Sequence, residues 1–224
     1  MPEVWLRPGM AVVFDMDGVI LDSNPLHLKA WTLYNQRLGV DLGESLAQRM
    51  HGGRNDEIVR DLFGPHLSPE EVAAHGVAKE KLYRALLAPQ LAEVLVPGVR
   101  QFLQRHAGQP VGLATNAEPA NVDFVLDRSG LRHYFRVIVD GHQVQFPKPH
   151  PEIYLRASEL LRVDPRNCVV FEDSPPGIQA ARAAGARIVG LRTTHRELPG
   201  ADLTIDNFLS PDLGPWLCGQ TPET

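Results

Sequence analysis

The sequence has little of what marks a secreted, disulfide-rich or membrane protein. Its 224 residues include only two cysteines, Cys168 and Cys218, and they lack the spacing of a metal or redox motif. This usage is typical of a reducing compartment. No apolar run reaches the roughly 18 residues of a membrane-spanning helix, and no basic stretch followed by an apolar one opens the chain. We therefore predict a cytoplasmic protein with no membrane segment.

Long runs of like charge are also missing. The formal net charge is −5, and no basic track is present that would bind a nucleic acid or an anionic lipid surface. A small anionic ligand would have to be held by a few well-placed cations. With 43% hydrophobic and 22% charged residues, the chain can bury one large core and a smaller second domain, so we expect a monomer.

Short apolar runs predict the strands of a buried parallel sheet. They lack the alternation of a half-exposed strand, as expected when helices cover both faces of the sheet. The runs are Ala11–Phe14, Val111–Ala114, Val137–Val139, Cys168–Phe171 and Arg187–Leu191. Helical patterns lie between most of them, for example Asn121–Ser129 before Gly130, and Pro175–Ala184 between Ser174 and Gly185. This order predicts a doubly wound, mostly parallel α/β sheet that binds its ligand at the carboxyl ends of the strands.

The alternation of strands and helices fails between the first and second strands. Residues 21–95 show helical patterns only, including a capping box at Ser68 to Glu71 and an apolar face of Leu26, Ala30, Leu33, Tyr34 and Leu38. We therefore predict an inserted α-helical domain of residues 21–95 and a catalytic core of residues 1–20 and 96–224. The segment after Leu209, rich in proline and glycine, is expected to be irregular surface chain.

The first strand ends directly in Asp15-Met16-Asp17-Gly18. Gly18 allows the backbone to turn, which can bring both carboxylates around one ligand. Two close carboxylates repel each other unless a cation or a proton lies between them, so the pair favours a hard divalent ion such as Mg²⁺. The alternative is an ordinary polar turn after a strand.

Polar groups follow three further segments of the predicted sheet. Thr115-Asn116 offers a hydroxyl and an amide suited to phosphate oxygens, and Lys148 lies between two prolines that stiffen the chain around it. Glu172-Asp173 is a second acidic pair. Each could be a routine turn, but their joint occurrence favours one site for a phosphate and a cation.

In this order and spacing, the four segments resemble the motifs of the haloacid dehalogenase superfamily. They are Asp15-Met16-Asp17-Gly18, Thr115-Asn116, Lys148-Pro149 and Glu172-Asp173-Ser174. The helical insertion resembles the cap of the β-phosphoglucomutase-like branch, so the resemblance covers nearly the whole chain. It implies a Rossmann-like core with a helical cap that closes over the substrate.

The resemblance also implies catalytic roles. Asp15 would attack phosphorus to form an aspartyl-phosphate, and Asp17 would act as the general acid and base. Lys148 would neutralise the transferring phosphoryl group, and Thr115 would hold its oxygens.

The implied cofactor is Mg²⁺. Its ligands would be the carboxylates of Asp15, Glu172 and Asp173 and the backbone carbonyl of Asp17.

Four further residues are candidate substrate contacts. They are Asn116 after the second strand and His27, Arg54 and Lys79 in the cap. Mutase-like relatives carry a histidine at the position of His27, although it could equally be an exposed helix residue. Single acids elsewhere, namely Asp22, Glu118 and Asp140, are interpreted as solvated turn or helix-start residues.

The reaction itself has two main alternatives. Where β-phosphoglucomutases carry a lysine and an asparagine, this chain has Ala117-Glu118-Pro119, and His51 stands in place of a cap lysine. These departures favour a phosphatase on a small phosphorylated metabolite, such as a sugar phosphate, over a mutase. A dehalogenase is disfavoured by the complete acidic site. A non-catalytic binding module is disfavoured because no motif is lost, and a receiver domain would not need the insertion.

Overall fold

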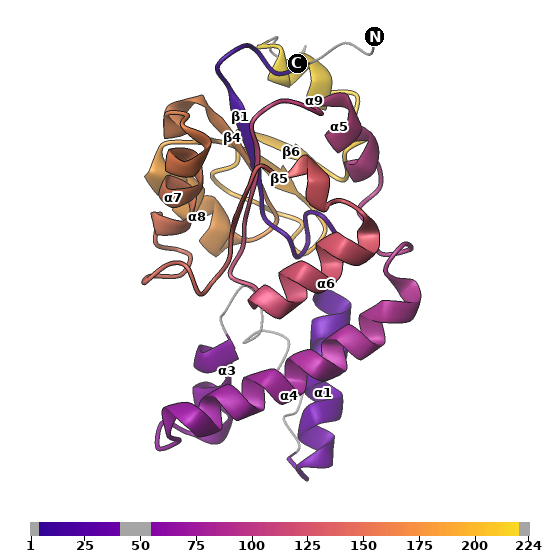
Figure 1. The fold of residues 1–224 in the computed structure, drawn as a ribbon, viewed down its shortest axis with the longest axis vertical. Coiled ribbons are helices and arrows are strands. Elements are labelled where there is room, and N and C mark those ends of the chain that lie inside the picture. Colours follow the sequence, from indigo (N-terminus) through magenta and orange to yellow (C-terminus); the bar gives the residue numbers. More distant parts are fainter. Residues whose placement is uncertain (1–4, 41–54, 220–224) are drawn as a thin grey trace.

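The computed structural model describes residues 5–40 and 55–219. Within them, one sheet contains six parallel strands in the order β3-β2-β1-β4-β5-β6 (Figure 1). The strands are β1 Ala11–Phe14, β2 Val111–Ala114, β3 Val137–Val139, β4 Cys168–Glu172, β5 Arg187–Leu191 and β6 Leu203–Ile205. The five predicted strands are confirmed, β4 being one residue longer. The sixth, β6, was not predicted, because Leu203-Thr204-Ile205 is too short to form a recognisable apolar run.

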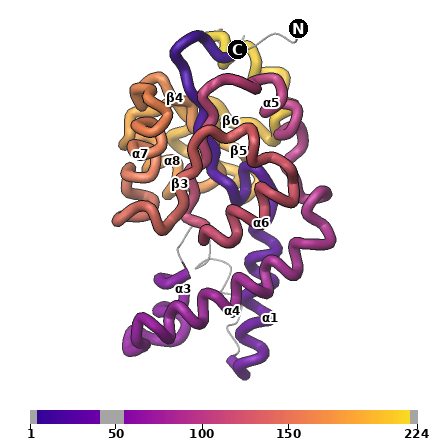
Figure 2. Tube along the Cα trace, in the orientation of Figure 1, coloured from indigo at the N-terminus to yellow at the C-terminus, as the bar shows by residue number. Residues whose placement is uncertain are grey.

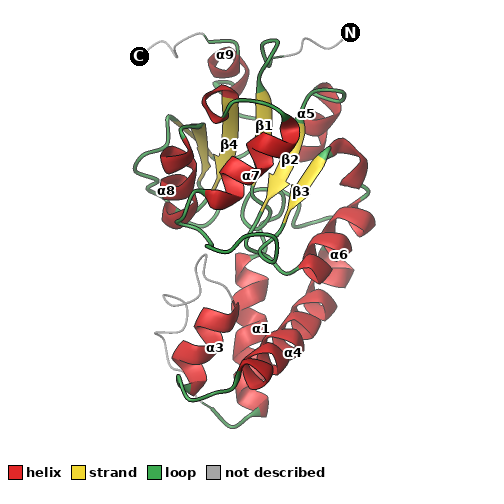
Figure 3. Ribbon diagram, turned by 60° about the vertical axis from the view of Figure 1, so that its left-hand side comes forward, coloured by secondary structure: helices red, strands yellow, loops and turns green. Residues whose placement is uncertain are grey.

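Helices cover both faces of the sheet (Figure 3). The side chains of Val12 and Phe14 pack in a core with α5 (Val99–Arg105) and α6 (Pro119–Ser129). The alternate residues Ala11 and Val13 pack with α7 (Glu152–Leu161) and α8 (Pro175–Ala184) on the other face. Burial on both faces explains why β1 is uniformly apolar rather than alternating.

The predicted helix ends are confirmed. The Ser174 hydroxyl accepts a hydrogen bond from the amide of Gly177 at the start of α8, and Gly185 ends that helix with φ 88°. Gly130 ends α6 in the same left-handed conformation, φ 69°, although α6 begins at Pro119, two residues earlier than predicted. Short 3₁₀ turns complete the connections at η1 Ala88–Gln90, η2 Arg132–Tyr134 and η3 Pro165–Asn167.

The insertion after β1 is helical, as predicted. Its helices are α1 Asn24–Arg37, α3 Asn55–Phe63 and α4 Pro69–Leu87, and they lie together beyond the carboxyl edge of the sheet (Figures 1 and 2). The capping box of Ser68 and Glu71 is present at the start of α4. A small core joins Trp31, Ile58, Val59 and Val72. The predicted apolar face of α1 was wrong at Leu38, which is exposed beyond the end of the helix, while Trp31 is buried instead.

The two chain segments that connect the insertion to the sheet run side by side. Leu21 and Leu95 form an antiparallel bridge. The amide of Asp22 donates to the carbonyl of Val94 at 2.7 Å, and the amide of Val96 donates to the carbonyl of Ile20 at 3.0 Å. This paired neck lies at the predicted junction of residues 20/21 and 95/96, and the exact domain boundaries stay a prediction.

The segment after Leu209 is more ordered than predicted. It contains α9 (Leu213–Leu217), whose Leu213 and Leu217 side chains are fully buried. The guanidinium carbon of Arg187 lies 3.9 Å from the Trp216 ring centroid. The prediction was wrong because Gly214 and Pro215 are poor helix formers and made the segment resemble a loop. Proline is nevertheless compatible with the first turn of a helix. None of the described helices is long and apolar enough to span a bilayer.

Candidate active site

Four adjacent strands bring the polar motifs together. β3, β2, β1 and β4 are neighbours and parallel, so their carboxyl ends open onto one edge of the sheet. A cavity of about 100 Å³ lies there, between the sheet and the insertion helices. The sequence-predicted residues that line it are Asp15, Asp17, His27, Lys79, Thr115, Asn116, Lys148, Glu172 and Asp173. Arg54 and His51 lie outside the described residues.

Lys148 is a buried cation on the core side of the cavity. Its Nζ donates to Asp15 Oδ1 at 2.6 Å, to Glu172 Oε1 at 2.7 Å and to the Ala114 carbonyl at 3.1 Å. Burial alone would lower the pKa of Lys148, but the charges of Asp15 and Glu172 raise it above its usual range. Lys148 is therefore fixed as an ammonium directly beside Asp15.

Glu172 is surrounded by donors. Its Oε1 accepts from Lys148 and from the Tyr154 hydroxyl at 2.7 Å. Its Oε2 accepts from the amides of Asp173 and Ser174 and from the Ser174 hydroxyl, at 2.9 to 3.2 Å. Burial would raise the pKa of Glu172, yet Lys148 and these hydrogen bonds hold it below its usual value. In this arrangement Glu172 anchors Lys148.

Gly177 gives Glu172 the space it needs, and we predict that Gly177→Ala perturbs this anchor. A Cβ at Gly177 would lie 1.7 Å from Glu172 Oε1, so the carboxylate would have to move. We expect a loss of stability of about 1–3 kcal/mol, as for overpacked interiors, together with reduced activity. Thermal unfolding and phosphate release would measure the two effects.

Gly76→Ala is the matched control for this prediction. A Cβ at this position in α4 meets its nearest neighbour, Asn55 Cβ, at 3.4 Å, an ordinary contact. Because glycine within a helix is destabilising relative to alanine by about 0.5–1 kcal/mol, Gly76→Ala is expected to be neutral or stabilising. Equal melting temperatures for both variants would contradict the proposed crowding at Gly177.

The positive charge near Asp15 and Asp173 is too small to balance the buried carboxylates gathered there. Burial, together with the charges of Glu172 and Asp17, raises the pKa of Asp15 to about 7 despite the neighbouring Lys148. Burial and the charges of Glu172 and Asp15 raise the pKa of Asp173 well above its usual range. Asp173 also accepts from the Thr194 hydroxyl and from Asn24 Nδ2.

The donor set at this point fits a hard divalent cation. No three His, Cys, Asp or Glu side chains in residues 5–40 and 55–219 are already gathered as a metal cluster. Nevertheless, the buried oxygens of Asp15 and Asp173 are the ligand type that Mg²⁺ prefers, and a cation would offset the repulsion that raises both pKa values. The Asp173 carboxylate packs directly on Gly18, where φ is +79° and a Cβ would lie 1.9 Å from its Oδ2.

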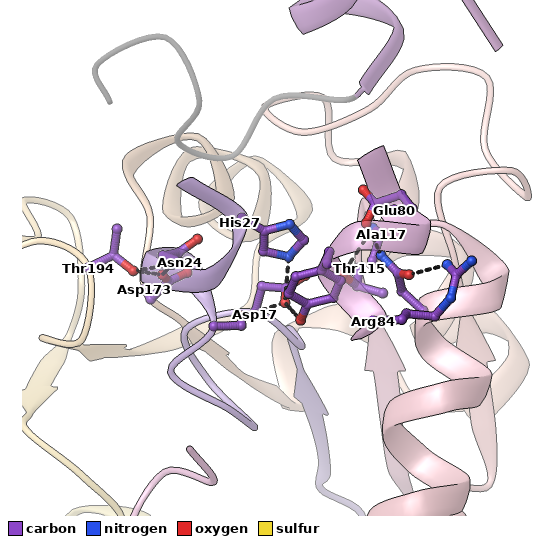
Figure 4. A network of polar contacts seen from close by, with 12 residues as sticks. Asp17, Asn24, His27, Glu80, Arg84, Thr115, Ala117, Asp173 and Thr194 are labelled. Atoms are coloured by element: carbon purple, nitrogen blue, oxygen red, sulfur yellow. Dashed lines mark hydrogen bonds and ion pairs between the residues drawn. The ribbon is translucent and has the colours of Figure 1, made fainter. Parts of the chain in front are cut away.

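Asp17 is held by the cap side of the cavity (Figure 4). Its Oδ1 accepts from the Ser23 hydroxyl at 2.5 Å and lies 3.3 Å from both His27 Nε2 and the Tyr83 hydroxyl. Burial would raise the pKa of Asp17, but the electrostatic interaction with the His27 ring and hydrogen bonds from His27 and Ser23 bring it below its usual value. These contacts fix the Asp17 carboxylate in one orientation.

His27 connects Asp17 to Lys79. Its ring stacks on Tyr83 with centroids 3.7 Å apart, and its Nδ1 lies 3.1 Å from Lys79 Nζ. Because an ammonium can only donate, Nδ1 accepts, which leaves Nε2–H to donate to Asp17. His27 therefore contacts Asp17 and Lys79 in the cavity and is not an exposed helix residue.

A second polar network joins the cap to the core. Lys79 Nζ donates to Glu80 Oε1 at 2.6 Å, and Asn55 Nδ2 donates to the same oxygen at 2.8 Å. Asn121 Nδ2, on core helix α6, donates to Glu80 Oε2 at 2.7 Å, and Arg84 donates to Asn121 Oδ1 at 2.7 Å. Through Glu80, the cap helix α4 is therefore bonded to a helix of the core.

The remaining predicted residues are placed as follows. Thr115 is buried, and its hydroxyl accepts from the amide of Ala117 at 3.2 Å. Asn116 Oδ1 accepts from the Lys148 amide at 3.4 Å. Asp22 is exposed as predicted, and Glu118 starts α6. Asp140 was wrongly predicted to be solvated, because it is buried and accepts from the His142 amide at 2.9 Å.

Several residues of the site were missed in the sequence. Four of them line the cavity, namely Asn24, Glu80, Asn121 and Thr194. Three others contact its carboxylates: Ser23 and Tyr83 donate to Asp17, and Tyr154 donates to Glu172. Only Tyr83 carried a usable signal, since it lies four residues after Lys79 and hence on the same helix face.

A family model for haloacid dehalogenase-like hydrolases matches residues 10–185. Fructose-1-phosphate phosphatase YqaB of Escherichia coli is 34% identical over 184 residues, covering 81% of this chain and 95% of the relative. A phosphorylated carbohydrates phosphatase of Thermotoga maritima is 36% identical over 188 residues, covering 81% and 84%. The crystal structure of β-phosphoglucomutase from Clostridium difficile superposes with a TM-score of 0.81 at 26% identity, covering 94% and 97%.

The chain belongs to the haloacid dehalogenase-like hydrolase family. Within that family it is an enzyme whose relatives include both phosphatases and a phosphomutase. The resemblance of its motifs and the predicted fold class are both confirmed.

Proposed function

We propose that the enzyme is a Mg²⁺-dependent phosphatase that acts on a small phosphorylated metabolite, namely a sugar phosphate, through an aspartyl-phosphate on Asp15. The observation that carries this proposal is the buried contact of 2.6 Å between Lys148 Nζ and Asp15 Oδ1. It sets a cation beside a buried carboxylate nucleophile in the lining of a polar cavity. The phosphatases among the relatives support the same reaction.

In the first step, a carboxylate oxygen of Asp15 forms a bond to phosphorus while the bond from phosphorus to the leaving oxygen breaks. Asp17 takes up a proton that the substrate brings as a phosphate monoester monoanion and delivers it to that oxygen, and the product alcohol departs. Lys148 offsets charge on the phosphoryl oxygens, and the buried Thr115 hydroxyl is placed to hold one of them.

In the second step, Asp17 accepts a proton from water as the water oxygen attacks phosphorus. The bond from phosphorus to Asp15 breaks, which releases inorganic phosphate and restores the carboxylate. Ser23, His27 and Tyr83 keep Asp17 oriented for both proton transfers.

The proposed Mg²⁺ ligands are Asp15, Glu172, Asp173 and the backbone carbonyl of Asp17. When bound, the cation supplies positive charge that stabilises the transferring phosphoryl group. The five hydrogen bonds that Glu172 accepts from Lys148, Tyr154, Asp173 and Ser174 support an anchoring role for it in addition.

Residues 21–95 are proposed to act as a cap that covers the cavity and excludes water during transfer. The substrate contacts proposed from this side are His27, Lys79 and Arg54, with Asn116 on the core side. We further propose that the enzyme acts as a monomer in the cytoplasm.

A phosphomutase is the second candidate, because the fold also matches a β-phosphoglucomutase at a TM-score of 0.81. The two reactions differ in what attacks the phosphorylated Asp15, namely water or a sugar hydroxyl. A mutase must also hold a second phosphate, so a cap cation that is already neutralised favours the phosphatase. Lys79 is such a cation, with Glu80 Oε1 at 2.6 Å.

Phosphate release from a panel of phosphorylated metabolites, with Mg²⁺ and with EDTA, tests the proposal. We expect release that requires Mg²⁺, because the charges around Asp15 and Asp173 are otherwise uncompensated. β-Glucose 1-phosphate with a glucose bisphosphate primer should be assayed in parallel for isomerisation. Isomerisation faster than release would identify a mutase, and release unaffected by EDTA would reject the metal.

A further inference from the structure

The described lining of the cavity contains many carboxylates and few cations. Among the described residues that line the cavity, six are carboxylates and two are lysines. Lys148 is bonded to Asp15 and Glu172, and Lys79 is bonded to Glu80. Neither lysine is therefore available to bind a second anion without losing a buried partner.

Glu80 is fixed in this lining of the cavity. It is only 4% exposed, and three side chains donate to it: Lys79 from its own helix, Asn55 from α3 and Asn121 from α6. Glu80 remains ionised because these partners, above all Lys79, keep its pKa below the usual value in spite of burial. A negative charge is thus held rigidly beside the space that the leaving group enters.

The surroundings of Glu80 suit hydroxyl groups. Asn55 and Asn121 add amides beside Glu80, and Trp31 and Ile58 add apolar surface to the lining of the cavity. Amides and an apolar wall are the usual means of binding a polyhydroxylated carbon chain, since hydroxyls both donate and accept. An additional phosphate or carboxylate would instead approach Glu80 in a buried place where screening by salt is weak.

We propose that Glu80 is a specificity-determining residue that restricts this enzyme to phosphate monoesters with an uncharged leaving group and rejects bisphosphates and phosphorylated acids. The inference rests on the proposed phosphatase function and deepens it. Glu80 acts in two ways. It neutralises Lys79, which would otherwise attract a second anion, and it repels that anion directly.

The test compares pairs of substrates that differ mainly in one additional anionic group. Glycerol 3-phosphate and 3-phosphoglycerate differ by a hydroxymethyl group against a carboxylate, and fructose 1-phosphate and fructose 1,6-bisphosphate differ by one phosphate. For the native enzyme, kcat/KM is expected to be at least about tenfold higher for the member of each pair whose leaving group is uncharged, because like charges repel in a partly buried site. A native enzyme that prefers the charged members would overturn the proposal without any variant.

Glu80→Gln keeps the shape of the side chain and removes its charge. We divide kcat/KM for the substrate with a charged leaving group by kcat/KM for its partner with an uncharged one. In Glu80→Gln this ratio is expected to rise by about tenfold or more. Glu93→Gln, at an exposed glutamate outside the cavity, is the control and should leave the ratio unchanged. A purely structural role for Glu80 would lower kcat/KM for both members equally, and an unchanged ratio would therefore reject the inference.

Failure of this inference can be told apart from failure of the proposed function. If no member of either pair, nor any other phosphate ester of the panel, releases phosphate, the phosphatase itself is rejected. If phosphate is released but the ratios do not depend on Glu80, only the specificity role is rejected. Should Glu80→Gln fail to fold, the double variant Lys79→Met with Glu80→Gln removes both charges together. It is expected to lose the part of the discrimination that comes from direct repulsion, because it leaves no freed lysine, and an unchanged ratio in this variant would reject the inference.

Discussion

Replacing Asp15 by asparagine is expected to abolish phosphate release, lowering kcat by at least about a thousandfold, as for loss of other enzymic nucleophiles. An amide oxygen is a poor nucleophile towards phosphorus. Glu172, the other carboxylate bonded to Lys148, already accepts hydrogen bonds on both of its oxygens. The fold should be retained. Asparagine has the same shape as aspartate and removes a charge that burial and Glu172 disfavour.

The control for Asp15→Asn is Asp22→Asn, at an exposed aspartate a few residues further along the chain. It makes the same chemical change outside the cavity, so its kcat should equal that of the native enzyme. Circular dichroism and thermal unfolding would confirm that both variants fold. Appreciable turnover by a folded Asp15→Asn protein, once deamidation has been excluded by mass spectrometry, would refute the aspartyl-phosphate route.

The second large effect is expected for Lys148→Met. Methionine fills a similar volume but removes the ammonium that contacts Asp15 and Glu172 at 2.6 and 2.7 Å. Loss of one electrostatic donor to a developing charge typically costs about a hundred- to a thousandfold in kcat. Because both carboxylates are buried, the variant should also lose about 3–5 kcal/mol of stability, the usual result of removing one partner of a buried ion pair.

The stability loss of Lys148→Met should depend on pH when measured without divalent cations. Asp15 has a folded-state pKa raised to about 7 even beside Lys148, so its ionisation destabilises the fold as the pH rises through that value. Without the lysine this penalty grows. The difference in unfolding free energy from the native protein should therefore be larger at about pH 8 than at about pH 5.

Lys81→Met provides the matched control, since Lys81 is exposed on α4. It should change stability by no more than about 0.5 kcal/mol and leave kcat unaltered. If Lys148→Met were as stable and as active as Lys81→Met, the buried ion cluster would have no role in either folding or catalysis.

The core of the fold was predictable because its signals are local. Uniform apolar runs such as Val12 to Phe14 reflect a sheet covered on both faces, and helix ends such as Ser174 and Gly185 are fixed by backbone chemistry within a few residues. β6 and α9 escaped prediction for the opposite reason. The short strand Leu203–Ile205 and the helix around Pro215 are stabilised by what they pack against, which a sequence pattern does not contain.

The same distinction applies to the site. Asp15, Thr115 and Glu172 could be placed together because the carboxyl ends of neighbouring parallel strands must meet at one edge. Glu80 and Asn121 could not, since their contact joins α4 to α6 across 41 residues of chain. Such contacts depend on how the cap rests on the core, and no periodicity in the sequence reports that arrangement.

The paired neck, in which Leu21 bridges Leu95 and Asp22 bonds to Val94, bears on whether the helical insertion could be exchanged for that of another protein. The two ends of the helical insertion are held side by side, so removing or replacing everything between them leaves the backbone of the core with no gap to span. Loop-closure entropy would be nearly unchanged by such a graft, because closure is achieved at the neck itself. We therefore expect that a different helical domain could replace the segment between residues 21 and 95, provided that it covers the apolar surface on which Leu26, Tyr83 and Leu87 pack.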